Sequence, residues 1–279
     1  MKFTKMHGAG NDYVYINGFK EQVDDPADLA QRVSHRQFGI GSDGLILILP
    51  SEIADVRMRM FNLDGSESEM CGNGIRCVAK YAYDHGLVDS LEITAETGAG
   101  VLSLTLFPGE SGLIERVRVD MGAPQLTRRA IPMLGAAEEK AIAVPIEIGS
   151  QEYEITAVSM GNPHAVVFVD DVETFPVTEV GPLIENHPWF PERVNVEFVQ
   201  VVSPTEVIQR TWERGSGETL ACGTGASAVT TAGVLTERTE RKITNHLRGG
   251  DLELEWLDGG SVMMTGPAVE VFSGDYDPK

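Results

Sequence analysis

The stretch Glu69-Met70-Cys71-Gly72-Asn73-Gly74 recurs in altered form as Leu220-Ala221-Cys222-Gly223-Thr224-Gly225. Each stretch places a cysteine before a Gly-polar-Gly step and runs into apolar residues at helical spacing, residues 75–85 and 226–235. Such a cysteine lies at a helix N-terminus, where N–H groups and the helix dipole favour negative charge and can lower a thiol pKa from about 8.5 to roughly 3.5–7.5. Two matched cysteines in the two halves of a chain indicate an acid and a base acting on one substrate.

Short strand-like stretches surround both cysteine windows. We expect strands at residues 2–6, 13–16, 45–49, 56–61, 91–95, 100–107, 113–121, 143–148, 153–159, 165–169, 194–201, 206–212, 252–256, 261–265 and 269–272. Further helices are expected at 26–37 and 177–186. Because strands predominate and do not alternate regularly with helices, the pattern predicts an α+β fold. The small apolar residues of the helices after the cysteines predict that both are buried inside curved sheets.

The composition restricts the classes of partner. The 279 residues can form two domains, and 22 Lys and Arg against 42 Asp and Glu give a net charge of −20. This acidity argues against binding to nucleic acid or to an anionic membrane surface. No apolar run approaches the roughly 18 residues of a membrane span, and the N-terminus lacks a secretion-signal pattern. With three cysteines in no disulfide pattern, we expect a soluble cytoplasmic protein.

The spacing of the cysteines disfavours other thiol chemistries. No Cys-x-x-Cys pair, the usual redox arrangement, is present. Cys71, Cys77 and Cys222 with His7 or His164 could nominally supply metal ligands, but their spacing does not resemble a zinc module, so we expect no metal. Cys77 falls inside the first helix and is predicted to be a core residue. One alternative stays open, a binding or redox protein in which Cys71 and Cys222 form a disulfide.

Several asparagine-bearing windows accompany the cysteines, at residues 62–67, 160–164 and 195–198, with a further polar window at 212–219. A single Asn is more often a turn residue than a ligand. Several such windows together favour a binding site, because Asn amides bind both carboxylates and ammonium groups. Arg214 can bind a carboxylate through two parallel hydrogen bonds.

Residues 7–12, 61–77, 160–164, 195–198 and 213–226 together resemble the diaminopimelate epimerase family, in the family's order and over nearly the whole chain. The resemblance implies an isomerase, independent of pyridoxal phosphate or any other cofactor, that interconverts LL- and meso-diaminopimelate in lysine and peptidoglycan precursor biosynthesis. It implies two similar domains, each a mixed curved sheet wrapped around a central helix, with the site between them. The implied domains are 1–122 plus 267–279 and 123–266, and the implied assembly is a homodimer.

The resemblance also implies a role for each matching residue. Cys71 and Cys222 correspond to the two acid/base cysteines, and His164 and Glu213 to the pair that adjusts their protonation. The implied substrate-binding residues are Asn11, Asn62, Gly72, Asn73, Asn162, Asn195, Glu213, Arg214, Gly223 and Thr224. The chain departs from the family at Gly44, where some relatives carry a substrate-contacting Gln.

The nearest alternative within enzymes is a racemase of proline or hydroxyproline, which would use the same pair of cysteines. Such a substrate has no distal amino-acid end to bind. The set of Asn residues together with Arg214 therefore favours diaminopimelate.

Overall fold

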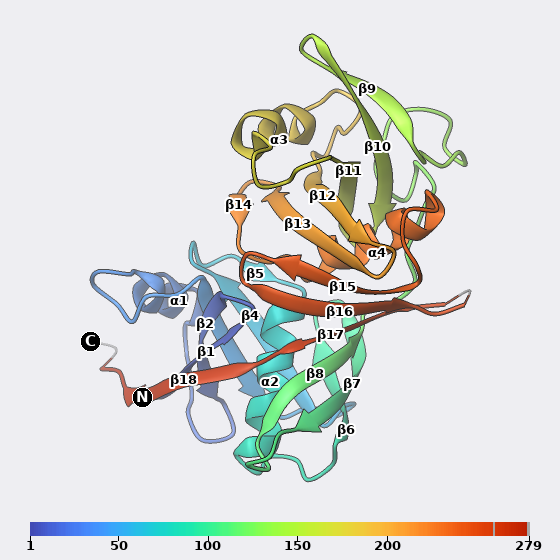
Figure 1. Cartoon of the computed structure of the whole chain (residues 1–279). Coiled ribbons are helices and arrows are strands. Elements are labelled where there is room, and N and C mark those ends of the chain that lie inside the picture. Colours follow the sequence, from blue (N-terminus) through green and yellow to red (C-terminus); the bar gives the residue numbers. More distant parts are fainter. Residues whose placement is uncertain (259, 278–279) are drawn as a thin grey trace. The chain divides into compact units, whose positions relative to one another are not determined.

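The computed structural model describes residues 1–258 and 260–277. The chain forms two compact units (Figure 1). Unit 1 is Met1–Asp120 with Thr265–Lys279, and unit 2 is Met121–Met264. Strand β17 (Val262–Pro267) leads the chain from unit 2 back to unit 1. Within the described ranges, no helix is long and apolar enough to cross a membrane.

Unit 1 is built on one mixed sheet. Its strands in order of pairing are β18 (Val269–Asp275), β1 (Lys2–Gly8), β2 (Asn11–Asn17), β3 (Gly44–Leu49), β4 (Val56–Asn62), β6 (Glu92–Thr97), β7 (Gly100–Pro108) and β8 (Ile114–Asp120), with β5 (Glu67–Ser68) also on β4. The pairs β2–β3 and β4–β6 are parallel and the other pairs are antiparallel. Helix α1 (Pro26–Ser34) connects β2 to β3 and buries its apolar side in a core that includes residues of these strands.

Helix α2 (Gly72–Asp84) lies inside this curved sheet, because it contacts β1, β2, β3, β4, β6, β7, β8 and β18 (Figure 1). Nearly all of its residues are buried. Two of them are cations: Arg76 Nε donates to Pro267 O at 3.1 Å, and Lys80 Nζ pairs with Asp84 at 2.7 Å. A buried charge without partners is costly, so these bonds allow Arg76 and Lys80 to occupy a central helix.

Unit 2 repeats the topology of unit 1. Its strands in order of pairing are β9 (Val144–Ile148), β10 (Gln151–Ser159), β11 (Pro163–Phe168), β12 (Asn195–Ser203), β13 (Glu206–Glu213), β15 (Lys242–Leu247) and β16 (Gly250–Trp256), with β14 (Gly217–Thr219) also on β13. The parallel pairs are β11–β12 and β13–β15. Helix α3 (Val177–Glu185) connects β11 to β12, and the buried helix α4 (Gly223–Leu235) contacts β10, β11, β12, β15 and β16. Strands β1 to β7 thus correspond to β10 to β16, and α2 corresponds to α4.

The predicted α+β class is confirmed, and both cysteine windows lead into buried helices. Strands β5, β14 and β15 were not predicted. In strand β15 every second residue is buried, but the central buried residue is the polar Asn245. Its Nδ2 donates to Gln209 Oε1 at 2.5 Å. The sequence therefore lacks the alternation of apolar residues that would predict this strand. The helix expected at 26–37 ends at Ser34, because His35 takes an extended conformation with φ −63° and ψ 116°.

Candidate active site

The predicted site residues of unit 1 lie at one edge of its sheet. Because β2 and β3 are parallel and β4 is antiparallel to β3, the starts of β2 and β3 and the end of β4 share an edge. Asn11 begins β2, Gly44 begins β3, and Asn62 ends β4 directly opposite Gly44. The N-terminus of α2 lies at the same edge, because Cys71 contacts Asn11.

The predicted residues of unit 2 occupy the corresponding places. Asn162 directly precedes β11, Asn195 begins β12 and Glu213 ends β13. His164, the second residue of β11, is paired with Asn195. The remaining residues, Arg214, Cys222, Gly223 and Thr224, lie on the chain from the end of β13 to the first turn of α4.

Both acid/base candidates are N-cap residues, as predicted. The sulfur of Cys71 accepts a hydrogen bond from the N–H of Gly74 at 3.4 Å, and that of Cys222 accepts one from Gly225 at 3.3 Å. Neither thiol forms a disulfide. The two cysteines therefore meet the same local backbone arrangement in the two units.

The expectation of a lowered thiol pKa is wrong for Cys222. Burial raises the pKa of Cys222 well above its ordinary value, and the negative charges of Glu213 and Glu197 raise it further. Hydrogen bonds from Thr224 and Gly225 act in the opposite direction but are outweighed. Helix-end stabilisation is a local effect visible in the sequence, whereas desolvation depends on the packed surroundings.

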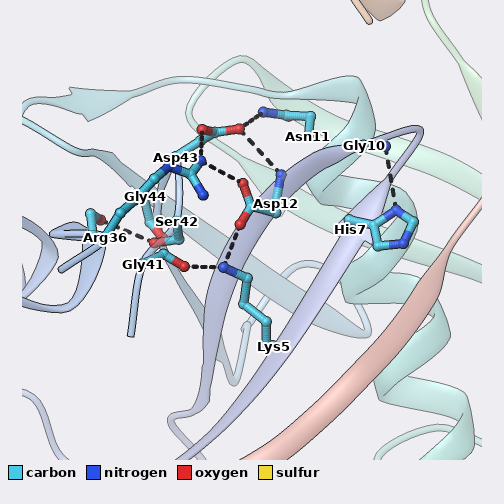
Figure 2. Close-up of polar contacts among 11 residues, drawn as sticks. Lys5, His7, Gly10, Asn11, Asp12, Arg36, Gly41, Ser42, Asp43 and Gly44 are labelled. Atoms are coloured by element: carbon cyan, nitrogen blue, oxygen red, sulfur yellow. Dashed lines mark hydrogen bonds and ion pairs between the residues drawn. The ribbon is translucent and has the colours of Figure 1, made fainter. Parts of the chain in front are cut away.

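An ionic network fixes the amide orientation of Asn11 (Figure 2). Its Nδ2 donates to Asp43 Oδ2 at 2.8 Å. Its Oδ1 is left to accept from the Cys71 thiol at 3.5 Å and from Asn73 Nδ2 at 3.4 Å. Arg36 Nη2 donates to the other carboxylate oxygen of Asp43 at 2.9 Å. Asp43 is therefore the group that turns the Asn11 carbonyl toward Cys71.

Asp12 completes the network between Arg36 and Lys5 (Figure 2). Burial raises the pKa of Asp12, but hydrogen bonds from Lys5 and Arg36 more than offset this, so that its pKa is lowered. Sequence reasoning missed Lys5, Arg36 and Asp43 as parts of the site. No sequence pattern indicates that these residues lie close together, because β1 and the loop after α1 come into contact only in the folded chain.

Asn195 and Arg214, both predicted to bind substrate, are linked through the backbone. Asn195 is buried, its Nδ2 donates to Pro163 O at 2.9 Å, and its Oδ1 accepts from the Arg214 N–H at 2.9 Å. The neighbouring Glu213 accepts a hydrogen bond from Thr219 Oγ1 at 2.6 Å. The Asn195 amide thus holds the segment that presents Glu213 and Arg214.

The packing around Gly44 leaves no room for a side chain. A Cβ at Gly44 would overlap the carbonyl oxygen of Phe61 on β4 and would lie 2.8 Å from the Tyr13 ring. The backbone of β3 therefore does not admit a side chain such as Gln at this position.

Cys77 is fully buried, and burial raises its pKa to about 11. The prediction that Cys77 is a core residue is confirmed. Across residues 1–258 and 260–277, no group of three or more His, Cys, Asp or Glu side chains is arranged to hold a metal ion.

Solved structures with this fold belong to a class of epimerases and related proteins. A PhzF-family phenazine biosynthesis protein from Bacillus anthracis superposes with a TM-score of 0.70 at 17% identity, covering 98% of each chain. A hydroxyproline epimerase from Agrobacterium vitis superposes with a TM-score of 0.68 at 18% identity, covering 98% of this chain and 90% of its own. At these identities the likeness establishes the fold.

Sequence similarity identifies the family within that class. The family model of diaminopimelate epimerase matches residues 3–127 and 156–271. The diaminopimelate epimerase of Agathobacter rectalis is 57% identical over 99% of both chains. The chain belongs to the diaminopimelate epimerase family.

Proposed function

We propose that the protein converts LL-diaminopimelate to meso-diaminopimelate by a two-base mechanism in which Cys71 and Cys222 exchange proton roles. It is then an isomerase of lysine and peptidoglycan precursor biosynthesis. One observation carries the proposal: two cysteines outside any disulfide occupy the same N-cap position in two units of the same topology. Similarity to diaminopimelate epimerases over the whole chain supports the choice of substrate.

The chemistry needs one base and one acid on opposite faces of the α-carbon. One cysteine, as thiolate, removes the α-proton, and the other, as thiol, returns a proton to the opposite face. The N–H groups of Gly74 and Gly225 donate hydrogen bonds to the sulfurs of Cys71 and Cys222, and these bonds stabilise whichever sulfur is anionic. Because both proton transfers use side chains of the chain, the proposed reaction requires no cofactor.

The developing charge on the substrate carboxylate needs its own stabilisation. We assign this role to the first helical turns, at Gly72-Asn73 and Gly223-Thr224, where helix N–H groups favour an anion. His164 and Glu213 adjust the protonation of the cysteines. The distal amino-acid end is assigned to Asn11, Asn62, Asn162, Asn195 and Arg214. Each unit then serves as one epimerase domain, and substrate binding must bring both thiols to one carbon.

Isotope exchange in deuterated water tests the proposal. Incubation with LL-diaminopimelate should place deuterium at the inverted α-carbon, with proline as a competing substrate that gains none. Cys71→Ala and Cys222→Ala should each abolish epimerisation, because each direction needs both an acid and a base. Cys77→Ala, which removes a core thiol, should retain it. A Cys222→Ala variant that epimerises near the wild-type rate would disprove the two-base mechanism.

Thiol oxidation distinguishes the proposed epimerase from a redox protein in which Cys71 and Cys222 form a disulfide. Oxidant should abolish epimerisation and a reducing agent should restore it, whereas activity indifferent to thiol state contradicts the proposal. The proposal includes a cytoplasmic location and a homodimeric assembly. Light scattering after size exclusion should give twice the 30.3 kDa of one chain.

A further inference from the structure

The surroundings of the two cysteines differ at one buried position. The third residue of β3 is Ile46, and the third residue of β12 is Glu197. A Cβ added to Gly74 would lie 2.7 Å from Ile46 Cδ1, and one added to Gly225 would lie 2.6 Å from Glu197 Oε1. The two side chains therefore occupy equivalent places under the first turn of the helix that each cysteine caps, and only one of them is acidic.

Glu197 is bonded to His164 in a fully buried pair. Both side chains have 0% exposure, and Glu197 Oε1 lies 2.8 Å from His164 Nδ1. The other ring nitrogen, Nε2, lies 3.0 Å from Asn162 Oδ1. Because an ionised carboxylate can only accept a hydrogen bond, the proton of this pair belongs on Nδ1. The carboxylate thus fixes the orientation of the ring and holds a proton on Nδ1.

The second carboxylate oxygen, Glu197 Oε2, has no hydrogen-bond partner within the described part of the chain. Burying a carboxylate that is only partly bonded costs folding free energy. The equivalent position in unit 1 shows that an apolar residue, Ile46, fills the same space without that cost. A costly charge in a place where an apolar residue fits indicates a functional role.

We propose that Glu197 is a positioning residue for the epimerisation, an inference that rests on the proposed function. Its carboxylate holds His164 with Nδ1 protonated and Nε2 toward Asn162, and its negative charge beneath α4 keeps the proton on Cys222. Ile46, at the equivalent position near Cys71, has a side chain that carries no charge and accepts no hydrogen bond. The two thiols are therefore chemically different, although their backbone settings match.

The charges that act on Cys222 in unit 2 come from two neighbouring strands. Glu213 ends β13 and Glu197 lies on β12, while His164 of β11 is bonded to Glu197. Both carboxylates add to burial in raising the pKa of Cys222. Removing the charge of Glu197 lowers that pKa, so the high-pH limit of proton donation by Cys222 moves to lower pH.

Two substitutions at Glu197 separate its charge from its hydrogen bond. Glu197→Ile gives unit 2 the residue that unit 1 carries at the equivalent position, Ile46. Glu197→Gln removes the charge but keeps an oxygen that can accept a hydrogen bond from His164 Nδ1. Glu154→Gln, a charge change at an exposed position on β10, is the control. We expect kcat of the Ile variant to fall by about 10–100-fold, with KM for diaminopimelate changed by no more than about twofold.

Readouts other than activity complete the test. The Gln variant should lose less kcat, and the high-pH limb of its profile should move to lower pH. Nitrogen-15 NMR of His164 should show a protonated Nδ1 in the wild type and in Glu197→Gln, and loss of this fixed Nδ1 proton in Glu197→Ile. Glu154→Gln should match the wild type in all three measurements.

Several results would overturn the proposal. One is an Ile variant with unchanged kcat, pH profile and His164 spectrum. Another is an Ile variant that loses activity through KM while the His164 spectrum stays unchanged, since this indicates a structural role alone. If thermal melting shows that Glu197→Ile does not fold, an unchanged pH profile in Glu197→Gln overturns it. A wild type without diaminopimelate epimerase activity would refute the proposed function, whereas the NMR comparison still decides whether Glu197 fixes His164.

Discussion

Replacing Asp43 with alanine should disorder the Asn11 amide and weaken the fold. The substitution removes the acceptor for Asn11 Nδ2 at 2.8 Å, for the Asp12 N–H at 3.2 Å and for Arg36 at 2.9 Å. A hydrogen bond to a charged group contributes about 1.5–3 kcal/mol, and an exposed ion pair at most about 1 kcal/mol. The Asp43 side chain is 36% exposed, so water replaces part of what is lost. We therefore expect a loss of about 2 kcal/mol in the free energy of unfolding.

The effect on activity follows from the freed amide. Without Asp43, the Asn11 carbonyl is no longer held against Cys71, and misplacement of a supporting group costs about 10–100-fold in rate. Urea denaturation should show a lower midpoint at an unchanged slope, and isotope exchange should show the slower reaction. Asp28→Ala is the matched control, because it removes a 2.8 Å pair with Arg32 on the exposed face of α1. If Asp43→Ala matches this control in both assays, the network does not orient Asn11.

Three further predictions concern unit 1. Gly44→Ala should destabilise the fold by about 3 kcal/mol in urea, because its Cβ meets the Phe61 carbonyl; full stability would contradict the steric explanation. Arg76→Met should lower the free energy of unfolding by about 3 kcal/mol in the same assay, because three buried acceptors lose the hydrogen bonds that Arg76 donates. An unchanged urea midpoint would show that these hydrogen bonds make no net contribution to stability. The lowered pKa of Asp12 means that its pairing with Lys5 stabilises the fold above the ordinary carboxyl pKa and is lost as pH falls through the folded-state value. The gap in melting temperature between wild type and Asp12→Asn should therefore be constant above about pH 5 and shrink as the pH falls below about 4, and a gap that stays constant there would refute this linkage.

The part of the site that depends on local spacing was predictable from the sequence. A cysteine before a Gly-polar-Gly step and an apolar helix predicted both N-caps, and the predominance of short strands over helices predicted the fold class. The duplicated topology is far clearer in the structure, because strand pairing persists where side chains no longer match.

Two charged partners of the site, Glu197 and Asp43, could not be predicted. Glu197 and Asp43 act on His164 and Asn11 across strand pairings and loop contacts that no sequence window contains. The raised pKa of Cys222 has the same origin, because its cause is burial against residues distant in the chain. Motifs therefore identified the two N-capping cysteines, whereas the contacts of Asp43 with Asn11 and of Glu197 with His164 emerged only from packing.

The pairing of the first strand with the last has a consequence for synthesis on the ribosome. Strand β1 pairs with β18, Phe3 packs edge-on against Phe272, and the N-terminal amine donates to Tyr276 O at 3.0 Å. Unit 2 is continuous in sequence and can complete its fold while the last residues of the chain are still unmade. Unit 1 must wait for them, with one edge of β1 open to wrong partners in the meantime. Strand β1, which is translated long before β18, is thus among the last strands to find its partner, and a chain that stops short of β18 leaves the ribosome with an unprotected strand.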